Sequence, residues 1–327
     1  MLLKTFKSNR AVNIVIFPLA GLLFWGKNLI HPQTYPFYNG ESGNFLYAPI
    51  QSLIGKFPFI QVLLAIILFI VLAFLMLYIT NKYNFIRERT MLPLPLFIIL
   101  VSGLTGMQTM HPVYPGAAFF LLAILRLFSA FDQTKPYSAA FDAGFLLGIA
   151  SLFYFNSYIL FPAFIFGLGI LSREIRWREF VIIFTGFFLP FTFAFSYAYL
   201  TDQFLEFIKI LEMNVITPND LCTPNVAFQI YTGYLIFLIL FGSVMIIQKY
   251  DSKKVSTRRY FMVFFLIFLF SVLGLIFIPA ISREMLVITA IPVTFLIADF
   301  FVSLRKRFWG ELWLTLLLVM VIVIQFF

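Results

Sequence analysis

Apolar residues run through the chain in long stretches that are separated by short polar segments. A helix that crosses a bilayer needs about 20 mostly apolar residues, so each stretch predicts a membrane-spanning helix. We expect eleven, at residues 11–30, 57–80, 91–109, 112–130, 138–154, 156–172, 180–200, 226–248, 260–279, 285–304 and 310–327. The pair 138–154 and 156–172 is short and separated only by a Phe-Asn-Ser turn, so it predicts either a tight hairpin or two broken helices.

The Lys and Arg residues predict how these helices are oriented. With the N-terminus inside, 19 of the 23 basic residues fall in inner segments, and the outer segments hold Lys27, Lys56, Lys209 and Arg283. This agrees with the excess of Lys and Arg in the cytoplasmic loops of membrane proteins. The C-terminus then lies outside.

The first apolar stretch follows the basic residues Lys4, Lys7 and Arg10, as a signal peptide would. It is longer than a usual signal core, and no small-x-small cleavage motif follows it. We therefore expect residues 11–30 to remain as a signal-anchor helix in the bacterial inner (cytoplasmic) membrane, with a cytoplasmic N-terminus.

Composition supports a membrane protein and excludes several other classes. Hydrophobic residues make up 62% of the chain and charged ones 11%, against about 45–50% and about 25% in soluble domains. The net charge of +9 is explained by the inner loops, so it does not predict nucleic-acid binding. We expect a single integral membrane domain over residues 1–327, an all-α polytopic bundle.

Metal and disulfide chemistry have little support in the residue counts. Cys222 is the single cysteine, so an intrachain disulfide is impossible, and two histidines are too few for a histidine-rich metal site. A divalent cation held by a surface carboxylate is the cofactor that the chain leaves open. The sequence contains no P-loop, HExxH or GxSxG motif.

Two outer segments, 31–56 and 201–225, are longer and more polar than the rest. In the second, residues 202–213 place apolar and charged side chains on different helical faces. This pattern predicts an amphipathic helix that lies in the membrane interface on the outer face.

Candidate chemistry gathers in the outer segments. Glu41 is the single acid of the first outer loop, with Asn44 nearby; it predicts either a general base or cation ligand, or a solvated carboxylate.

Arg283 and Glu284 share a short outer turn. There Arg283 predicts either a clamp for a lipid phosphate or a residue that reaches the head groups or pairs with Glu284. His111 ends an outer helix and is either a supporting base or ligand, or a turn residue.

Acids inside the predicted spans are few. Asp142 and Asp299 lie near inner helix ends, where we expect them to pair with basic neighbours such as Lys135 and Arg305. No string of acids reaches the membrane centre, which disfavours a proton-driven transporter.

Residues 91–200 and 280–300 resemble polytopic glycosyltransferases of the GT-C type, which use lipid-phosphate-linked sugars. The resemblance lies in FDAGFLLGIASLFYFNSYILFPAFIFGLGIL, with Gly144 and Gly148 on one helix, in GFFLPFTFAFSYAYLTDQF, and in SREMLVITAIPVTFLIADFF, which contains Arg283. It implies a GT-C-like fold and a catalytic acid at the position of Glu41. The chain differs from that family where Glu41 stands without an Asp-containing pair, and where Tyr154 and Phe155 replace a basic residue.

As a whole the chain also resembles an uncharacterised, Bacteroidota-type family of integral inner-membrane proteins. Two functions are therefore expected. The first is transfer of a sugar from a polyprenyl-phosphate carrier on the outer face, with membrane lipids as further partners. The alternative is a non-catalytic subunit that binds other membrane proteins of an envelope-assembly or secretion complex.

Overall fold

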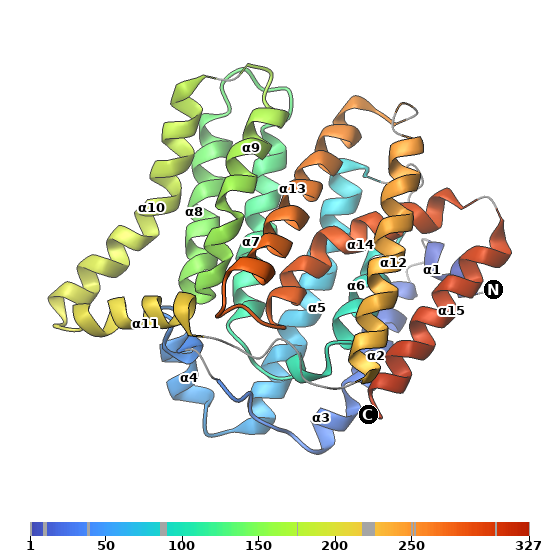
Figure 1. The fold of residues 1–327 in the computed structure, drawn as a ribbon, viewed down its shortest axis with the longest axis horizontal. Helices are drawn as coiled ribbons and strands as arrows, with labels where there is room; N and C mark the ends of the chain where they lie inside the picture. The colour runs from blue at the N-terminus through green and yellow to red at the C-terminus, as the bar shows by residue number, and fades with distance from the viewer. Residues whose placement is uncertain are drawn as a thin grey trace.

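Every regular element that the structure describes is a helix, as expected of apolar segments whose backbone polar groups must be satisfied without water. The computed structural model describes residues 2–8, 12–37, 40–85, 90–174, 176–217, 226–249, 251, 253–304 and 306–326. Five helices are long and apolar enough to cross a membrane (Figure 1): α5 (Pro58–Tyr83), α10 (Trp177–Leu200), α12 (Val226–Gln248), α13 (Val255–Phe277) and α14 (Met285–Ser303).

Shorter apolar helices occupy the remaining predicted segments. They are α2 (Asn13–Phe24), α6 (Pro93–Ser102), α7 (Val113–Ser129), α8 (Tyr137–Phe153), α9 (Phe161–Leu171) and α15 (Arg307–Ile324). The other elements are α1 (Leu2–Lys7), α3 (Gly26–Ile30), α4 (Ala48–Ile54), α11 (Phe204–Ile216), and the 3-10 turns η1 (Glu41–Gly43), η2 (Thr105–Met107) and η3 (Phe155–Leu160).

Several predicted helices have other boundaries in the structure, and two of the predicted segments are interrupted. The segment 91–109 is helical only over α6, because the side-chain amides of Gln108 and Gln325 donate to the carbonyl of Ser102, at 3.1 and 2.7 Å, where the helix ends. The segment 11–30 breaks at Trp25, which is fully buried and stacks on Phe69 with ring centroids 5.2 Å apart.

Helix α8 packs between α7 and α10, and glycines set its distance from α10. A Cβ atom at Gly144, Gly148 or Gly186 would stand 2.4 to 2.5 Å from a backbone oxygen of the facing helix. Small residues at such spacing let two helix backbones touch. The close packing fixes the end of α8, where the chain turns at Tyr154.

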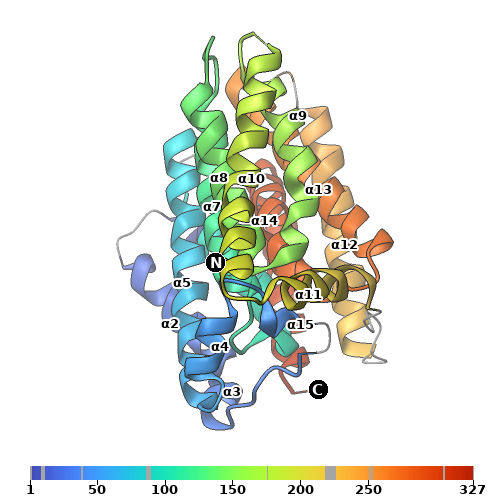
Figure 2. The same cartoon turned by 90° about the vertical axis from the view of Figure 1, so that its left-hand side faces the viewer.

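Helix α14 lies in the middle of the bundle and is buried along most of its length (Figure 1). It packs against α6, α7, α12 and α13. Figure 2 shows α11 running crosswise beneath α10, at the end of the bundle that also carries α3 and α4. The turn before α14 opens toward that same end, so distant loops meet there.

Asp142 and Asp299 are paired with basic residues, as expected, although the partners are not their neighbours in sequence. Asp142 lies 3.1 Å from Arg126, and Asp299 lies 2.5 Å from Lys253. The pairing of these two acids therefore requires neither Lys135 nor Arg305, and Arg305 lies outside the described residues. Helix packing brings α7 to α8 and the start of α13 to the end of α14, and the neighbours in sequence did not indicate this.

Candidate functional site: a buried acid pair

Glu41 is buried, although it lies in a polar loop outside the long helices. Its side chain sits in η1 and the residue is 1% exposed. Gly40 precedes it with a φ of 71°, a left-handed conformation that glycine adopts without a Cβ clash. This turn directs the carboxyl group into the protein, which excludes the interpretation of Glu41 as a solvated carboxylate.

His111 is the hydrogen-bond partner of Glu41. Its Nε2 lies 3.1 Å from Glu41 Oε2, and its Nδ1 accepts the backbone N–H of Val113 at 3.1 Å. Because Nδ1 is an acceptor, a neutral ring must carry its proton on Nε2 and donate it to Glu41. Burial lowers the pKa of His111 to about 4, against a smaller raising effect of Glu284, so the ring is neutral at pH 7.

Glu284 supplies a second buried carboxyl group from the turn before α14. Its Oε1 accepts the Ser282 backbone N–H at 2.7 Å and the Tyr154 hydroxyl at 3.4 Å, and its Oε2 accepts the Ser282 hydroxyl. The residue is fully buried. Tyr154 comes from the end of α8, so two segments that are distant in sequence meet at this carboxyl group.

Glu41 and Glu284 lie close enough for the charge of Glu41 to raise the pKa of Glu284. Glu41 Oε1 is buried and has no hydrogen-bond partner in the described chain. The two carboxyl groups therefore titrate as a coupled pair. Burial raises the pKa of Glu41 from 4.5 to about 7, an effect that Glu284 partly offsets; burial and the charge of Glu41 raise the pKa of Glu284.

Arg283 precedes Glu284, but its guanidinium points elsewhere. It lies over the ring of Phe228 at 4.6 Å, and its Nε and Nη2 are buried without a hydrogen-bond partner in the described chain. Its Nη1 lies beside Gly106. Buried donors of a cation are costly to leave unpaired, and a planar guanidinium suits a phosphate or carboxylate.

Asn44 has a positioning role. Its Nδ2 donates to the carbonyl of Phe153 at 3.0 Å, and its Oδ1 accepts from Asn214 at 3.1 Å. These bonds tie the first outer loop to the end of α8 and to α11. They fix the loop that carries Glu41 and do not bring Asn44 to the acid pair.

Aromatic side chains cover the site. Tyr35 contacts the ring of His111 edge-on with centroids 4.6 Å apart, and the ring of Phe37 stacks on it with centroids 5.7 Å apart. A polar cavity of about 320 Å³ lies beside this cover and is lined in part by Lys27, Tyr35 and Gly106. Neither Glu41 nor Arg283 lines it, so this cavity does not join the two residues.

Sequence reasoning missed Tyr154 and Ser282 as ligands of the acid pair. Tyr154 stood out in the sequence as a replacement for a basic residue, and its contact with Glu284 arises from helix packing. No group of three His, Cys, Asp or Glu side chains in the described residues is arranged to hold a metal ion.

Fold and site together define a helical membrane protein with a buried pair of glutamates at one end of the bundle. Within that class, the chain belongs to DUF6427, a family of unknown function whose model matches residues 43–327. His111, Arg283 and Glu284 lie inside the matched region, and Glu41 immediately precedes it. No curated protein and no solved structure matches the chain.

Proposed function

We propose that the protein transfers a sugar, or a related group, from a polyprenyl-phosphate carrier on the outer face of a bacterial inner membrane. The observation that carries this proposal is the buried Glu41–Glu284 pair, one residue away from a guanidinium with unpaired buried donors. Group transfer from a lipid phosphate needs both a base and positive charge at the leaving group.

In this mechanism Glu41 is the base. Its Oε1 takes the proton of an acceptor hydroxyl, the acceptor oxygen attacks the anomeric carbon, and the bond from that carbon to the phosphate oxygen breaks. The electron pair leaves on the phosphate, which Arg283 holds. A pKa of about 7 suits a base that works near neutral pH.

Glu284 and His111 position this base. His111 holds Oε2 and leaves Oε1 available, while Glu284 partly offsets the effect of burial on the pKa of Glu41. Substrate reaches Oε1 only if the segment that carries Tyr35 and Phe37 moves, because these rings cover His111.

The membrane arrangement is part of the proposal. The five long helices and the six shorter ones would make eleven crossings in a GT-C-like bundle, with a cytoplasmic N-terminus and α11 in the outer interface. Support comes from the Lys and Arg distribution and from the match of eleven apolar helices to eleven predicted segments.

Measurements of substrate binding and of turnover distinguish the role of Arg283 from that of Glu41. Arg283→Ala should weaken binding of polyprenyl phosphate about 10- to 100-fold, the effect of losing a charged hydrogen bond, and Arg283→Lys should restore part of it because an ammonium lacks the planar fork. Glu41→Gln should keep binding and abolish transfer. Lys209→Ala, which removes an exposed outer cation, is the matched control.

Native mass spectrometry of the purified protein with polyprenyl phosphate measures the binding. Equal affinity in the wild type, Arg283→Ala and Lys209→Ala proteins would remove Arg283 from the phosphate site.

One observation favours the alternative, a non-catalytic subunit of an envelope-assembly or secretion complex. Glu41, His111 and Glu284 are all buried, and the polar cavity beside them contains neither Glu41 nor Arg283. A purely structural acid pair has this arrangement. The subunit model predicts that a Glu41→Gln strain assembles the same envelope complex and grows like the wild type.

A further inference from the structure

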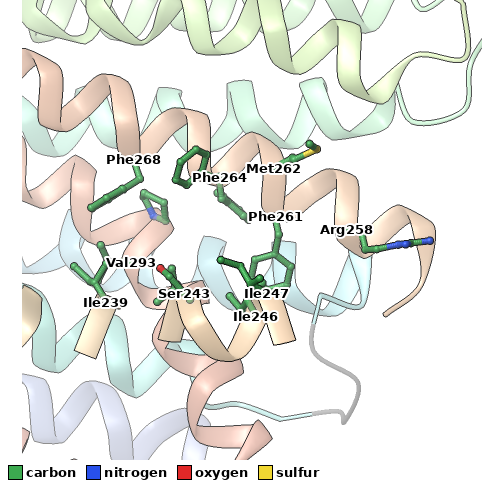
Figure 3. Close-up of a pocket in the computed structure, with 13 residues that line it drawn as sticks. Ile239, Ser243, Ile246, Ile247, Arg258, Phe261, Met262, Phe264, Phe268 and Val293 are labelled. Carbon is green, nitrogen blue, oxygen red and sulfur yellow. The ribbon is translucent and has the colours of Figure 1, made fainter. Parts of the chain in front are cut away.

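The polar cavity lies beside the acid pair, because Tyr35 both lines it and contacts the ring of His111. Its volume of about 320 Å³ is near the lower limit for small-molecule sites. A groove of similar volume between α12 and α13, shown in Figure 3, is apolar apart from Ser243 and Arg258 among the described residues that line it. A small ligand rich in hydroxyl groups therefore fits the polar cavity and not the groove.

Side-chain amides hold the wall of the polar cavity in place. Asn28 Nδ2 donates to Gln108 Oε1 at 3.2 Å, and Gln108 Nε2 donates to Gln325 Oε1 at 3.2 Å. Thr109 follows Gln108 in the same wall, and its hydroxyl is buried without a hydrogen-bond partner in the described chain. A buried hydroxyl is costly to leave unpaired, so Thr109 indicates a polar partner that the described residues do not supply.

The charge of the cavity is positive. Lys27 lines it, and its Nζ donates to the carbonyl of Gln325 at 3.4 Å, a long bond that does not use all the donors of an ammonium group. None of the described residues that line the cavity is an Asp or a Glu. The cavity therefore suits a neutral or anionic group and repels a cation.

Arg283 lies next to the wall of the cavity at Gly106. A Cβ atom added to Gly106, which lines the cavity, would stand 4.0 Å from Arg283 Nη1, with no other described atom so near outside the adjoining residues. No side chain therefore fills the space between the guanidinium and the cavity at this point. A phosphate bound by Arg283 would place the group that it carries at the cavity.

We propose that the polar cavity binds the sugar of a sugar phosphate whose phosphate is held by Arg283, and that it excludes sugars with a free amino group. Lys27 and Thr109 donate hydrogen bonds to the sugar hydroxyl groups. The proposal rests on the proposed function for the role of Arg283, and it names the class of sugar that this site accepts.

The test measures the affinity of the full-length protein for three ligands by native mass spectrometry: farnesyl phosphate, farnesyl-phosphate glucose and farnesyl-phosphate glucosamine. Glucose should tighten binding about tenfold, the effect of one hydrogen bond from a charged donor, whereas glucosamine should not, because its ammonium group meets Lys27. Free glucose 1-phosphate, added as a competitor, distinguishes the sources of the sugar phosphate. Displacement at equal concentration supports a soluble sugar phosphate, and displacement only in large excess supports the lipid carrier; the site stands in both cases.

Two variants change the cavity. Lys27→Gln and Gly106→Trp should remove the preference for glucose and leave farnesyl phosphate bound, which shows that the protein is folded. Lys56→Gln, at an exposed lysine outside the cavity, and Gly233→Trp, at an exposed glycine of α12 with open space around it, should keep the preference.

The proposal is overturned if the wild type binds the three ligands equally, or if Lys27→Gln or Gly106→Trp keeps the preference for glucose. A wild-type protein that prefers glucose but transfers no sugar would contradict the proposed function alone.

Discussion

Glu41 and Glu284 owe their properties to each other and to their burial. A carboxylate removed from water is destabilised, so burial raises the pKa of both acids, and the charge of Glu41 raises the pKa of Glu284 further. His111 cannot neutralise the pair by ionising, because burial lowers the pKa of its own ring to about 4.

The raised pKa of Glu41 predicts how stability changes with pH. The folded state binds the Glu41 proton more tightly than the unfolded state, so this contribution is present below pH 4.5 and is lost as pH rises to about 7. The full loss is on the order of 3 kcal/mol. Glu41→Gln, which resembles the protonated acid, should become more stable relative to wild type across this window.

His111 changes stability in the opposite direction. Its depressed pKa stabilises the fold above pH 6.5, and this stabilisation is lost as pH falls through about 4.

Thermal unfolding of the wild type and Glu41→Gln proteins in detergent, from pH 4.5 to 7.5, measures the difference in stability between these two proteins. A difference that does not grow with pH would mean that Glu41 ionises freely in the folded protein.

The sequence identified the ionisable residues individually, but it did not show that they lie together in one site. Glu41, His111 and Glu284 stood out because polar ionisable residues are rare between apolar segments. Their meeting depends on contacts across 70 and more residues, such as His111 with Glu41, which local patterns do not encode.

At the scale of elements, α11 packs against the bundle and leaves other side chains exposed. Its Phe207 and Asn214 are buried, while Phe204 and Glu206 are both exposed on different sides of the helix. Spin labels at 204 and 206, in a protein whose single cysteine is replaced by Cys222→Ser, should report lipid at 204 and water at 206. Equal accessibility to oxygen and to a polar relaxation agent at both positions would contradict an interfacial α11.

Hydropathy predicted helices well where packing does not interrupt them. Segments 112–130 and 138–154 appear as α7 and α8 within one residue at each end. The end of α6 was not predictable, because the donors to Ser102 come from Gln108 beyond the helix and Gln325 near the end of the chain.

At the scale of the whole molecule, topology is open to direct test. Reporter tags inserted at 81–90 and 249–259 should be cytoplasmic, and a tag at the C-terminus should be external, because Lys and Arg concentrate in the former segments. Protease protection in intact spheroplasts measures this. A cytoplasmic C-terminus would mean that one predicted crossing, most simply one within 138–172, is not made.

The proposed transfer reaction requires Glu41 as its base, and the most direct test is the rate of transfer as a function of pH. Release of polyprenyl phosphate from a panel of polyprenyl-phosphate monosaccharides should rise with a midpoint near pH 7, the pKa of Glu41. Glu284→Leu should move the midpoint to higher pH, because it removes the interaction with Glu284 that lowers the pKa of Glu41, and Glu41→Gln should reduce the rate to background at every pH. A Glu41→Gln protein with the wild-type rate and the same midpoint would contradict the account.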